Sequence, residues 1–281
     1  MNLKSSASVP NFQSDGLSIT AAEPWFKVKV QLIQSYLQAF IMNASSKVDE
    51  IIFIDLFSGS GLYSMGHQKE VFPGSNLLSL TLEPPFHKLI FCEDDDEQAN
   101  ALERRVKRLF PKTNVEILNF PTEELTAALI ANIPRSKSGH KVATLCLVDS
   151  FSFDIQWAII EKLADAGVSF LIPFTFAINN RMDLRHYCQE QGDVLKRIAG
   201  DANYKRLSSM GSNFHFYKTL VRIYKNKFLV RGLNSAISSH KLESRLMDLP
   251  VFDIGFFSKQ FSAQAIQRDV NVSEHLQFEL F

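Results

Sequence analysis

Apolar positions recur along the chain in two rhythms, which predict helices and strands in alternation. After residue 24 they recur every three or four positions as far as Asn43, which predicts a helix opened by Pro24. Five short, continuous apolar runs predict strands at residues 51–57, 89–92, 115–118, 142–148 and 168–174. Helical patterns that separate the later runs cover residues 94–110, with Asp94 as the expected N-cap, 122–133 and 154–166.

Strands that are apolar throughout and alternate with helices predict an α/β fold, with a mostly parallel, Rossmann-like sheet and helices on both faces. The rhythm breaks at about 181–212, where a charged, helical insert is expected before a helix at 216–226. The apolar runs at 228–235 and 251–257 predict two closing strands as an antiparallel pair. We therefore expect a flexible N-terminal arm over residues 1–22, which is Ser-rich and aperiodic, and one domain over 23–281.

Composition narrows the class of protein without naming its chemistry. The chain has 281 residues, 46% of them hydrophobic, which is typical of one globular domain. Its 30 basic and 30 acidic residues give no net charge, unlike a nonspecific nucleic-acid binder. The three cysteines have no CxxC or zinc-ligand spacing, so no metal site is expected. A signal peptide and a membrane-length apolar run are both missing from the sequence, which predicts a cytoplasmic protein that does not bind membranes.

The first predicted strand ends in a glycine-rich loop, Asp55-Leu56-Phe57-Ser58-Gly59-Ser60-Gly61. An open parallel sheet binds ligands at the carboxyl ends of its strands, and glycines there let the backbone turn sharply and approach a ligand. Exposed N–H groups then meet a carboxylate or a phosphate. The alternative is an ordinary Gly/Ser turn after a strand.

Two further strand ends carry candidate ligand contacts. Glu93 follows the second strand, where its carboxylate can accept both ribose hydroxyls of an adenine nucleoside. An acid at a helix start is the alternative, but the next three residues are all aspartates and already fill that role. Asn119 and Phe120 follow the third strand, where an amide can bond the adenine edge and a ring can cover its face; the alternative is a plain turn.

The fourth strand ends at Asp149, with Phe151 two residues later. An acid and an aromatic ring at the end of a central strand are placed to act on a substrate: Asp149 can orient a nucleophile and Phe151 can stack on a planar group. The alternative is a helix N-cap by Asp149 or Asp154. Asp149 and Phe151 are the candidate catalytic residues.

Several segments, in their order along the chain, resemble the three-Cys-motif partner protein (TcmP) family, whose members have a SAM-dependent methyltransferase fold. These segments are Asp15-Gly16-Leu17, Trp25-x-x-x-Lys29, Ile54 to Gly61, Pro73-Gly74-Ser75 with Asn76-Leu77, Phe91-Cys92-Glu93, Leu147 to Phe151 with Trp157, and Ile254 to Lys259. The resemblance implies a class I methyltransferase sheet with a C-terminal antiparallel strand, and S-adenosyl-L-methionine (SAM) as cofactor. It implies that Lys29, Asp55, Phe57, Ser58, Gly59, Ser60, Gly61, Glu93, Asn119 and Phe120 bind the cofactor.

The chain departs from the family pattern at two prolines, which are Ser60 and Ser150 here, and lacks the family's acid after the third strand. Two hypotheses follow. The first is a SAM-dependent methyltransferase of the TcmP type that acts on a nucleic-acid base or a protein side chain. The second is a catalytically inactive SAM-binding module that acts through a three-Cys-motif partner protein, in defence against mobile elements.

A third hypothesis is an NAD-linked oxidoreductase, based on the near-fingerprint Gly59-x-Gly61-x-x-Ser64. Its third glycine is replaced by Ser64, and no Tyr-x-x-x-Lys pair or substrate histidine stands out. We rank it below the other two. The sequence gives no indication of the oligomeric state.

Overall fold

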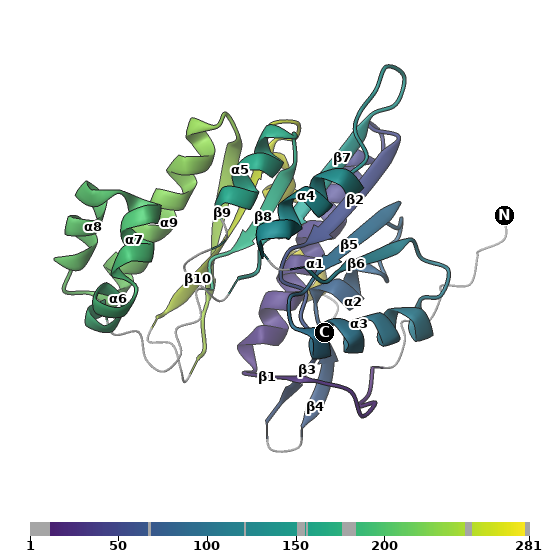
Figure 1. The fold of residues 1–281 in the computed structure, drawn as a ribbon, viewed down its shortest axis with the longest axis horizontal. Coiled ribbons are helices and arrows are strands. Elements are labelled where there is room, and N and C mark those ends of the chain that lie inside the picture. Colours follow the sequence, from purple (N-terminus) through teal and green to yellow (C-terminus); the bar gives the residue numbers. More distant parts are fainter. Residues whose placement is uncertain are drawn as a thin grey trace.

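The central sheet of the protein has seven strands, in the order β6-β5-β2-β7-β8-β10-β9 (Figure 1). The structure is a computed structural model and describes residues 12–66, 69–120, 122–150, 155, 157–175, 184–244 and 249–278. The strands of this sheet are β2 (Glu50–Asp55), β5 (Lys88–Cys92), β6 (Val115–Leu118), β7 (Val142–Leu147), β8 (Ser169–Pro173), β9 (Asn234–Lys241) and β10 (Val251–Ser258).

The strand directions confirm the predicted fold class. Strands β6, β5, β2, β7 and β8 run parallel, and β10 is antiparallel to both of its neighbours. The chain passes from β2 outward to β5 and β6, then returns to the other side of β2 for β7 and β8. The strand order therefore reverses between β2 and β7, and a ligand site is expected at the carboxyl ends of the strands there. We call this edge of the sheet the carboxyl edge.

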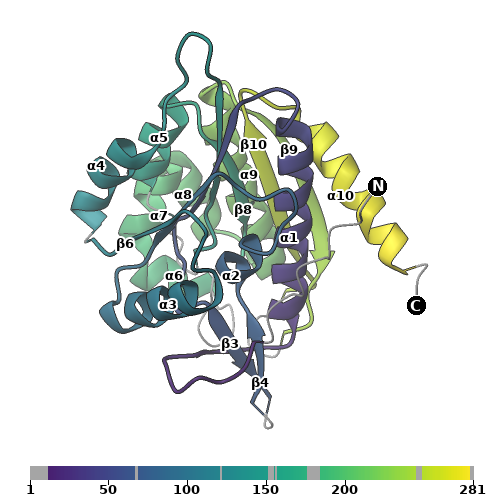
Figure 2. The same cartoon turned by 90° about the vertical axis from the view of Figure 1, so that its right-hand side faces the viewer.

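Helices cover both faces of the sheet, as predicted. Helices α1 (Trp25–Ala44) and α10 (Ala263–Phe278) lie on one face, and α4 (Thr122–Asn132) and α5 (Trp157–Asp165) lie on the other (Figure 2). Both faces need a helical cover because successive side chains of a strand point to opposite faces, as two neighbouring residues of β10 show. Phe256 packs against Phe40 of α1, and Phe257 stacks on Phe228 of α9 (Asn213–Val230) with ring centroids 4.2 Å apart.

Short elements that the sequence analysis missed lie between β2 and β5 and before α1. A three-stranded sheet joins β1 (Thr20–Ala22), β3 (Leu62–Met65) and β4 (Glu70–Pro73), and helix α2 (Ser75–Ser79) follows. Within the described part of the arm, residues 12–22, strand β1 pairs in parallel with β3. A three-residue strand has too few side chains to show an alternation in the sequence.

Two of the element boundaries that differ from the prediction have a clear local cause. Asp95, not Asp94, caps α3 (Asp96–Leu109), because its side chain accepts a hydrogen bond from the Gln98 N–H. Residues 228–230 finish α9 instead of opening a strand, and β9 begins only at Asn234. Gly232, with φ +79°, lies just beyond the end of α9 and is the residue type that favours this left-handed conformation.

The described part of the expected insert is helical and packs beside α9 (Figure 1). It contains α6 (Leu184–Glu190), α7 (Gly192–Ala199) and α8 (Asp201–Ser208). Among the described residues, no helix is both long enough and apolar enough to cross a membrane.

Candidate functional site

The glycine-rich loop after β2 combines two glycines that serve different purposes. Both have positive φ, +63° at Gly59 and +89° at Gly61, a region that side chains with a Cβ rarely adopt. A Cβ at Gly61 would lie 2.9 Å from Leu102 Cδ1 and 3.1 Å from Leu77, so this glycine is required for packing. A Cβ at Gly59 would meet only Gln98 Oε1, at 3.6 Å. Gly59 is therefore the position where the backbone stays open to a ligand.

Glu93 at the end of β5 reaches this open position. The Gly59 N–H donates to Glu93 Oε2 at 2.6 Å, and the Asp95 N–H donates to Glu93 Oε1 at 3.0 Å. The carboxylate thus binds the loop and the start of the next helix together. Burial raises the pKa of Glu93 above its ordinary value, although both backbone bonds oppose the shift. Loop and acid meet at one point of the carboxyl edge, as the sequence analysis predicted.

Asp55, the first residue of the loop, is a buried acid. It accepts hydrogen bonds from the Phe57 N–H at 3.3 Å and from the Ser75 hydroxyl at 3.2 Å. Burial and the neighbouring charge of Asp149 raise its pKa to about 7. Neither Asp55 nor Glu93 has an ion-pair partner among the described residues. Two acids at the ends of neighbouring strands thus have no counter-ion within the described part of the chain.

Asp149, at the end of β7, is paired with a buried lysine from α1. Lys29 Nζ lies 2.9 Å from Asp149 Oδ1 and 2.8 Å from Oδ2, and the lysine side chain is 0% exposed. Thr175 also donates to Asp149, at 3.3 Å. The ammonium group lies 4.2 Å from the ring centre of Phe26 and 5.7 Å from that of Trp25. The sequence analysis placed Lys29 among the cofactor ligands; its observed partner is the candidate catalytic acid.

Arg105 of α3 attaches the N-terminal segment to the glycine-rich loop. Its buried guanidinium donates to both carboxylate oxygens of Asp15, at 2.7 and 3.0 Å, and to the carbonyl oxygens of Ser18 and Ser60. Asn76 of α2 supports the same loop from the other side, because its amide donates to the Ser58 carbonyl at 2.6 Å. The Arg105 guanidinium lowers the pKa of Asp15 to about 2. The loop is thus fixed by α2 and α3.

Three of the remaining predicted ligands have hydrogen-bond partners within the protein. Ser58 and Ser60 are buried, and their hydroxyls donate to backbone carbonyls instead of pointing to an open site. The Asn119 amide donates to Asp96 at 2.6 Å, so its observed partner is the start of α3. Phe120 is partly exposed, at 38%. Phe151 lies outside the described residues.

Sequence reasoning did not single out four residues that support the site. Ser75 and Asn76 stood in a turn noted only for its resemblance to a family motif, and Arg105 stood in a charged stretch interpreted as solvated. Thr175 carried no motif at all. The described residues contain no group of three or more His, Cys, Asp or Glu side chains that could hold a metal ion.

No family model matches the chain, and no curated protein matches it at the level of sequence. Solved structures of similar shape include a human methyltransferase 10 domain containing protein, at 11% identity and a TM-score of 0.48, with 82% of this chain and 83% of that chain covered. The N-terminal domain of human METTL16 in complex with SAH has 12% identity and a TM-score of 0.45, with 88% and 77% covered. An O-methyltransferase from Bacillus cereus in complex with SAH has 10% identity and a TM-score of 0.42, with 80% of each chain covered.

Proposed function

We propose that the chain is a SAM-dependent methyltransferase, with the cofactor at the carboxyl edge between the glycine-rich loop and Glu93. One observation carries the proposal: the Gly59 N–H lies 2.6 Å from the Glu93 carboxylate, which joins the carboxyl ends of β2 and β5 next to the place where the strand order reverses. A carboxylate beside an open backbone position is suited to the two ribose hydroxyls of an adenosyl group. Strand order and residue chemistry point to the same place.

The charge of the site fits SAM better than a dinucleotide. Asp55, Asp149 and Glu93 contribute three carboxyl groups, and Lys29 is the one cation paired with any of them among the described residues. SAM carries a sulfonium and an ammonium group, so its positive charge would favour the ionised form of Asp55. The pyrophosphate of NAD would instead add negative charge beside three acids. This electrostatic argument disfavours the oxidoreductase hypothesis.

Methyl transfer requires an acceptor that is oriented while it loses a proton. When bound, SAM would supply an electrophilic methyl group, with S-adenosylhomocysteine as the leaving group. Asp149 would orient the acceptor, and its pairing with Lys29 keeps the carboxylate fixed in position. A nucleic-acid base or a protein side chain is the acceptor class that we propose, in a protein of the TcmP type.

The same ion pair favours a second candidate, an inactive SAM-binding module that acts through a three-Cys-motif partner protein. Asp149 already accepts hydrogen bonds from Lys29 and Thr175, which leaves fewer lone pairs for an acceptor. Ser60 and Ser150, where the family resemblance expects prolines, favour the same candidate. In this candidate the residues at Gly59 and Glu93 still hold the cofactor.

Calorimetric titration with SAM and with S-adenosylhomocysteine tests the cofactor site. Glu93→Ala is expected to weaken SAM binding by about 1.5–3 kcal/mol, the range for hydrogen bonds to a charged group. Glu103→Ala is the matched control, because that acid is exposed on α3 and, among the described residues, its ion pair is with Lys107. No binding by the wild-type chain, or equal affinity in Glu93→Ala, would remove the proposal.

Transfer of a radiolabelled methyl group from SAM separates the two candidates. We expect label to appear in RNA, DNA or protein fractions with the wild-type chain and to be lost with Asp149→Asn. SAM binding without transfer to any of these fractions would support the inactive module instead.

A further inference from the structure

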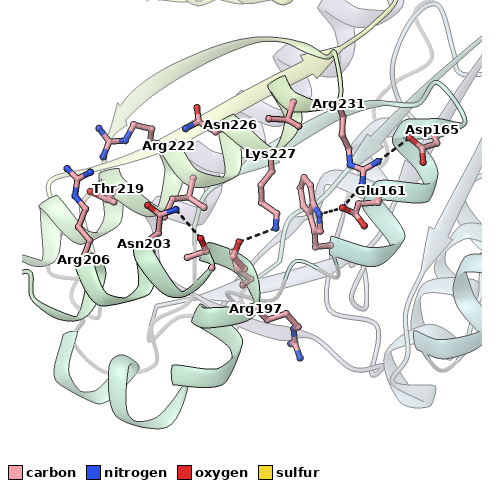
Figure 3. Close-up of a pocket in the computed structure, with 16 residues that line it drawn as sticks. Glu161, Asp165, Arg197, Asn203, Arg206, Thr219, Arg222, Asn226, Lys227 and Arg231 are labelled. Carbon is pink, nitrogen blue, oxygen red and sulfur yellow. Dashed lines mark hydrogen bonds and ion pairs between the residues drawn. The ribbon is translucent and has the colours of Figure 1, made fainter.

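A second candidate site lies away from the glycine-rich loop, in a groove between α5, α7, α8 and α9 (Figure 3). Its volume is about 1040 Å³. Five cationic side chains line it, against two acids. The cations are Arg197, Arg206, Arg222, Lys227 and Arg231; the acids are Glu161 and Asp165. We call this the basic groove.

Both acids of the basic groove are engaged by one arginine at the same end. Arg231 lies 2.6 Å from Glu161 and 3.2 Å from Asp165. Lys227, in the middle, donates to the Ile198 carbonyl and lies 4.7 Å from the ring centre of Trp157. These contacts hold the walls of the groove together and leave neither acid of its described lining paired with Arg206 or Arg222.

Arg206 and Arg222 are the side chains at the other end, as Figure 3 shows. Both residues are exposed, and in the part of the chain that the structure describes neither guanidinium has an ion-pair or hydrogen-bond partner. They come from two different helices, α8 and α9. The two guanidinium groups therefore present an uncompensated double positive charge to a ligand.

The shape of the groove suits an extended ligand. One wall of the groove is formed by α9 and the residue that caps it, Arg231. The lining positions 219, 222, 223, 226, 227, 230 and 231 share one face of this helix. At 1.5 Å of rise per residue, this wall is about 18 Å long. Asn226 of α9 and Asn203 of α8 add polar side chains to the lining, and the Asn203 amide donates to the Ala199 carbonyl at 3.0 Å. A compact anion would fill only part of this length.

We propose that the basic groove binds the phosphodiester backbone of a nucleic acid. A guanidinium presents two parallel N–H donors that match the oxygens of a phosphate, and phosphates repeat along the strand whatever its sequence. Trp157 is held by Glu161, 2.6 Å from its indole nitrogen, and by Lys227 against its ring, so the proposed contacts are to the backbone and not to stacked bases. The inference rests on the proposed function in one respect, since it selects nucleic acid from the two acceptor classes.

Fluorescence anisotropy with a labelled 20-nucleotide RNA, and with DNA of the same sequence, tests the groove in the absence of SAM. The double variant Arg206→Ala, Arg222→Ala is compared with Arg104→Ala, Lys112→Ala, which removes the same charge from exposed positions on and after α3. We expect the groove variant to bind at least fivefold more weakly. We also expect the slope of log affinity against log salt to fall by about 1.4, or about 0.7 for each lost phosphate contact on a single strand. The control should match the wild type.

The outcomes separate the groove from the cofactor site. Equal loss in both double variants, or no binding of RNA or DNA by the wild-type chain at low salt, would overturn the groove. Binding of poly-glutamate as tight as that of nucleic acid, with the same loss in the groove variant, would also overturn it, in favour of an acidic protein partner. In each case SAM titration of the same preparations shows separately whether the proposed function stands. Tighter binding of RNA than DNA, or the reverse, would name the polymer.

Discussion

The carboxyl edge and the basic groove hold charge in opposite ways. At the edge, Asp55 and Asp149 are buried, Glu93 is half-buried, and one buried lysine pairs with Asp149. In the groove, Arg206 and Arg222 stand in solvent with no partner among the described residues. The zero net charge of the chain conceals this separation. Buried charges act strongly over short range on a small ligand, whereas exposed charges act together on a polymer and are screened by salt.

The largest expected effect is the loss of stability when the buried ion pair of Lys29 and Asp149 at the carboxyl edge is broken. Lys29→Met should lower the free energy of unfolding by about 3–5 kcal/mol, because it leaves Asp149 charged, buried and unpaired. Urea denaturation measures this change. Arg231→Met in the groove removes a more exposed arginine and should cost about 0–1 kcal/mol. Similar losses in the two variants would erase the distinction between the regions.

A smaller effect comes from two glycines with similar backbone conformations. Gly61 lies in the site loop with φ +89°, and Gly200 lines the groove with φ +76°. An alanine Cβ at position 61 would meet Leu102 at 2.9 Å, whereas nothing lies within 4 Å of one at position 200. Both substitutions share the strain of a positive φ, so their difference isolates packing. We expect Gly61→Ala to cost about 1–3 kcal/mol more in thermal unfolding.

The smallest expected effect is a pH dependence of SAM binding at the carboxyl edge. The pKa of Asp55 is raised to about 7, so below that pH the ligand-free protein holds a proton that a cationic ligand would release. Affinity for SAM should therefore rise with pH up to about 7, by as much as about tenfold per pH unit, and then level off. Asp55→Asn should remove the dependence. Calorimetry between pH 5 and 8 measures it, and a flat wild-type profile would contradict the assignment.

The stability of the ligand-free protein should change with pH in the opposite direction to the affinity for SAM. The pKa of Asp55 is higher in the folded chain than its ordinary value of 3.8, so the folded state holds the proton more tightly than the unfolded state does. The free energy of unfolding of the ligand-free protein should then fall as pH rises from about 4 to about 7. Asp201→Asn, which changes an exposed acid on α8, serves as the control.

The long elements were predictable because periodicity belongs to local sequence. Strand β6 was predicted at its observed bounds, and β7 differed by one residue at its end. The closing strands show the limit: the apolar run at 228–230 completes helix α9, where only Phe228 of the three is buried, and the glycine at 232 was the signal that would have corrected the boundary.

The residues of the candidate site that follow consecutive strands could be predicted from the sequence. Contacts between side chains far apart in the sequence could not. Gly59 and Glu93 follow consecutive strands of the predicted sheet, so a parallel arrangement brings them together. Lys29 and Asp149 are 120 positions apart, and no local sequence pattern predicts that their side chains meet. The contact between Arg105 and Asp15 likewise depends on tertiary packing alone.

The two tryptophans give each region its own optical signal. Trp25 is 5% exposed and lies beside Lys29, whereas Trp157 forms a wall of the basic groove beside Lys227. Since the chain has only these two, Trp25→Phe and Trp157→Phe would each leave a single emitter. Quenching of one emitter by cofactor and of the other by a polyanion could then be followed without any attached dye. A change in the fluorescence of one tryptophan when ligand binds at the other site would show that the two sites are coupled.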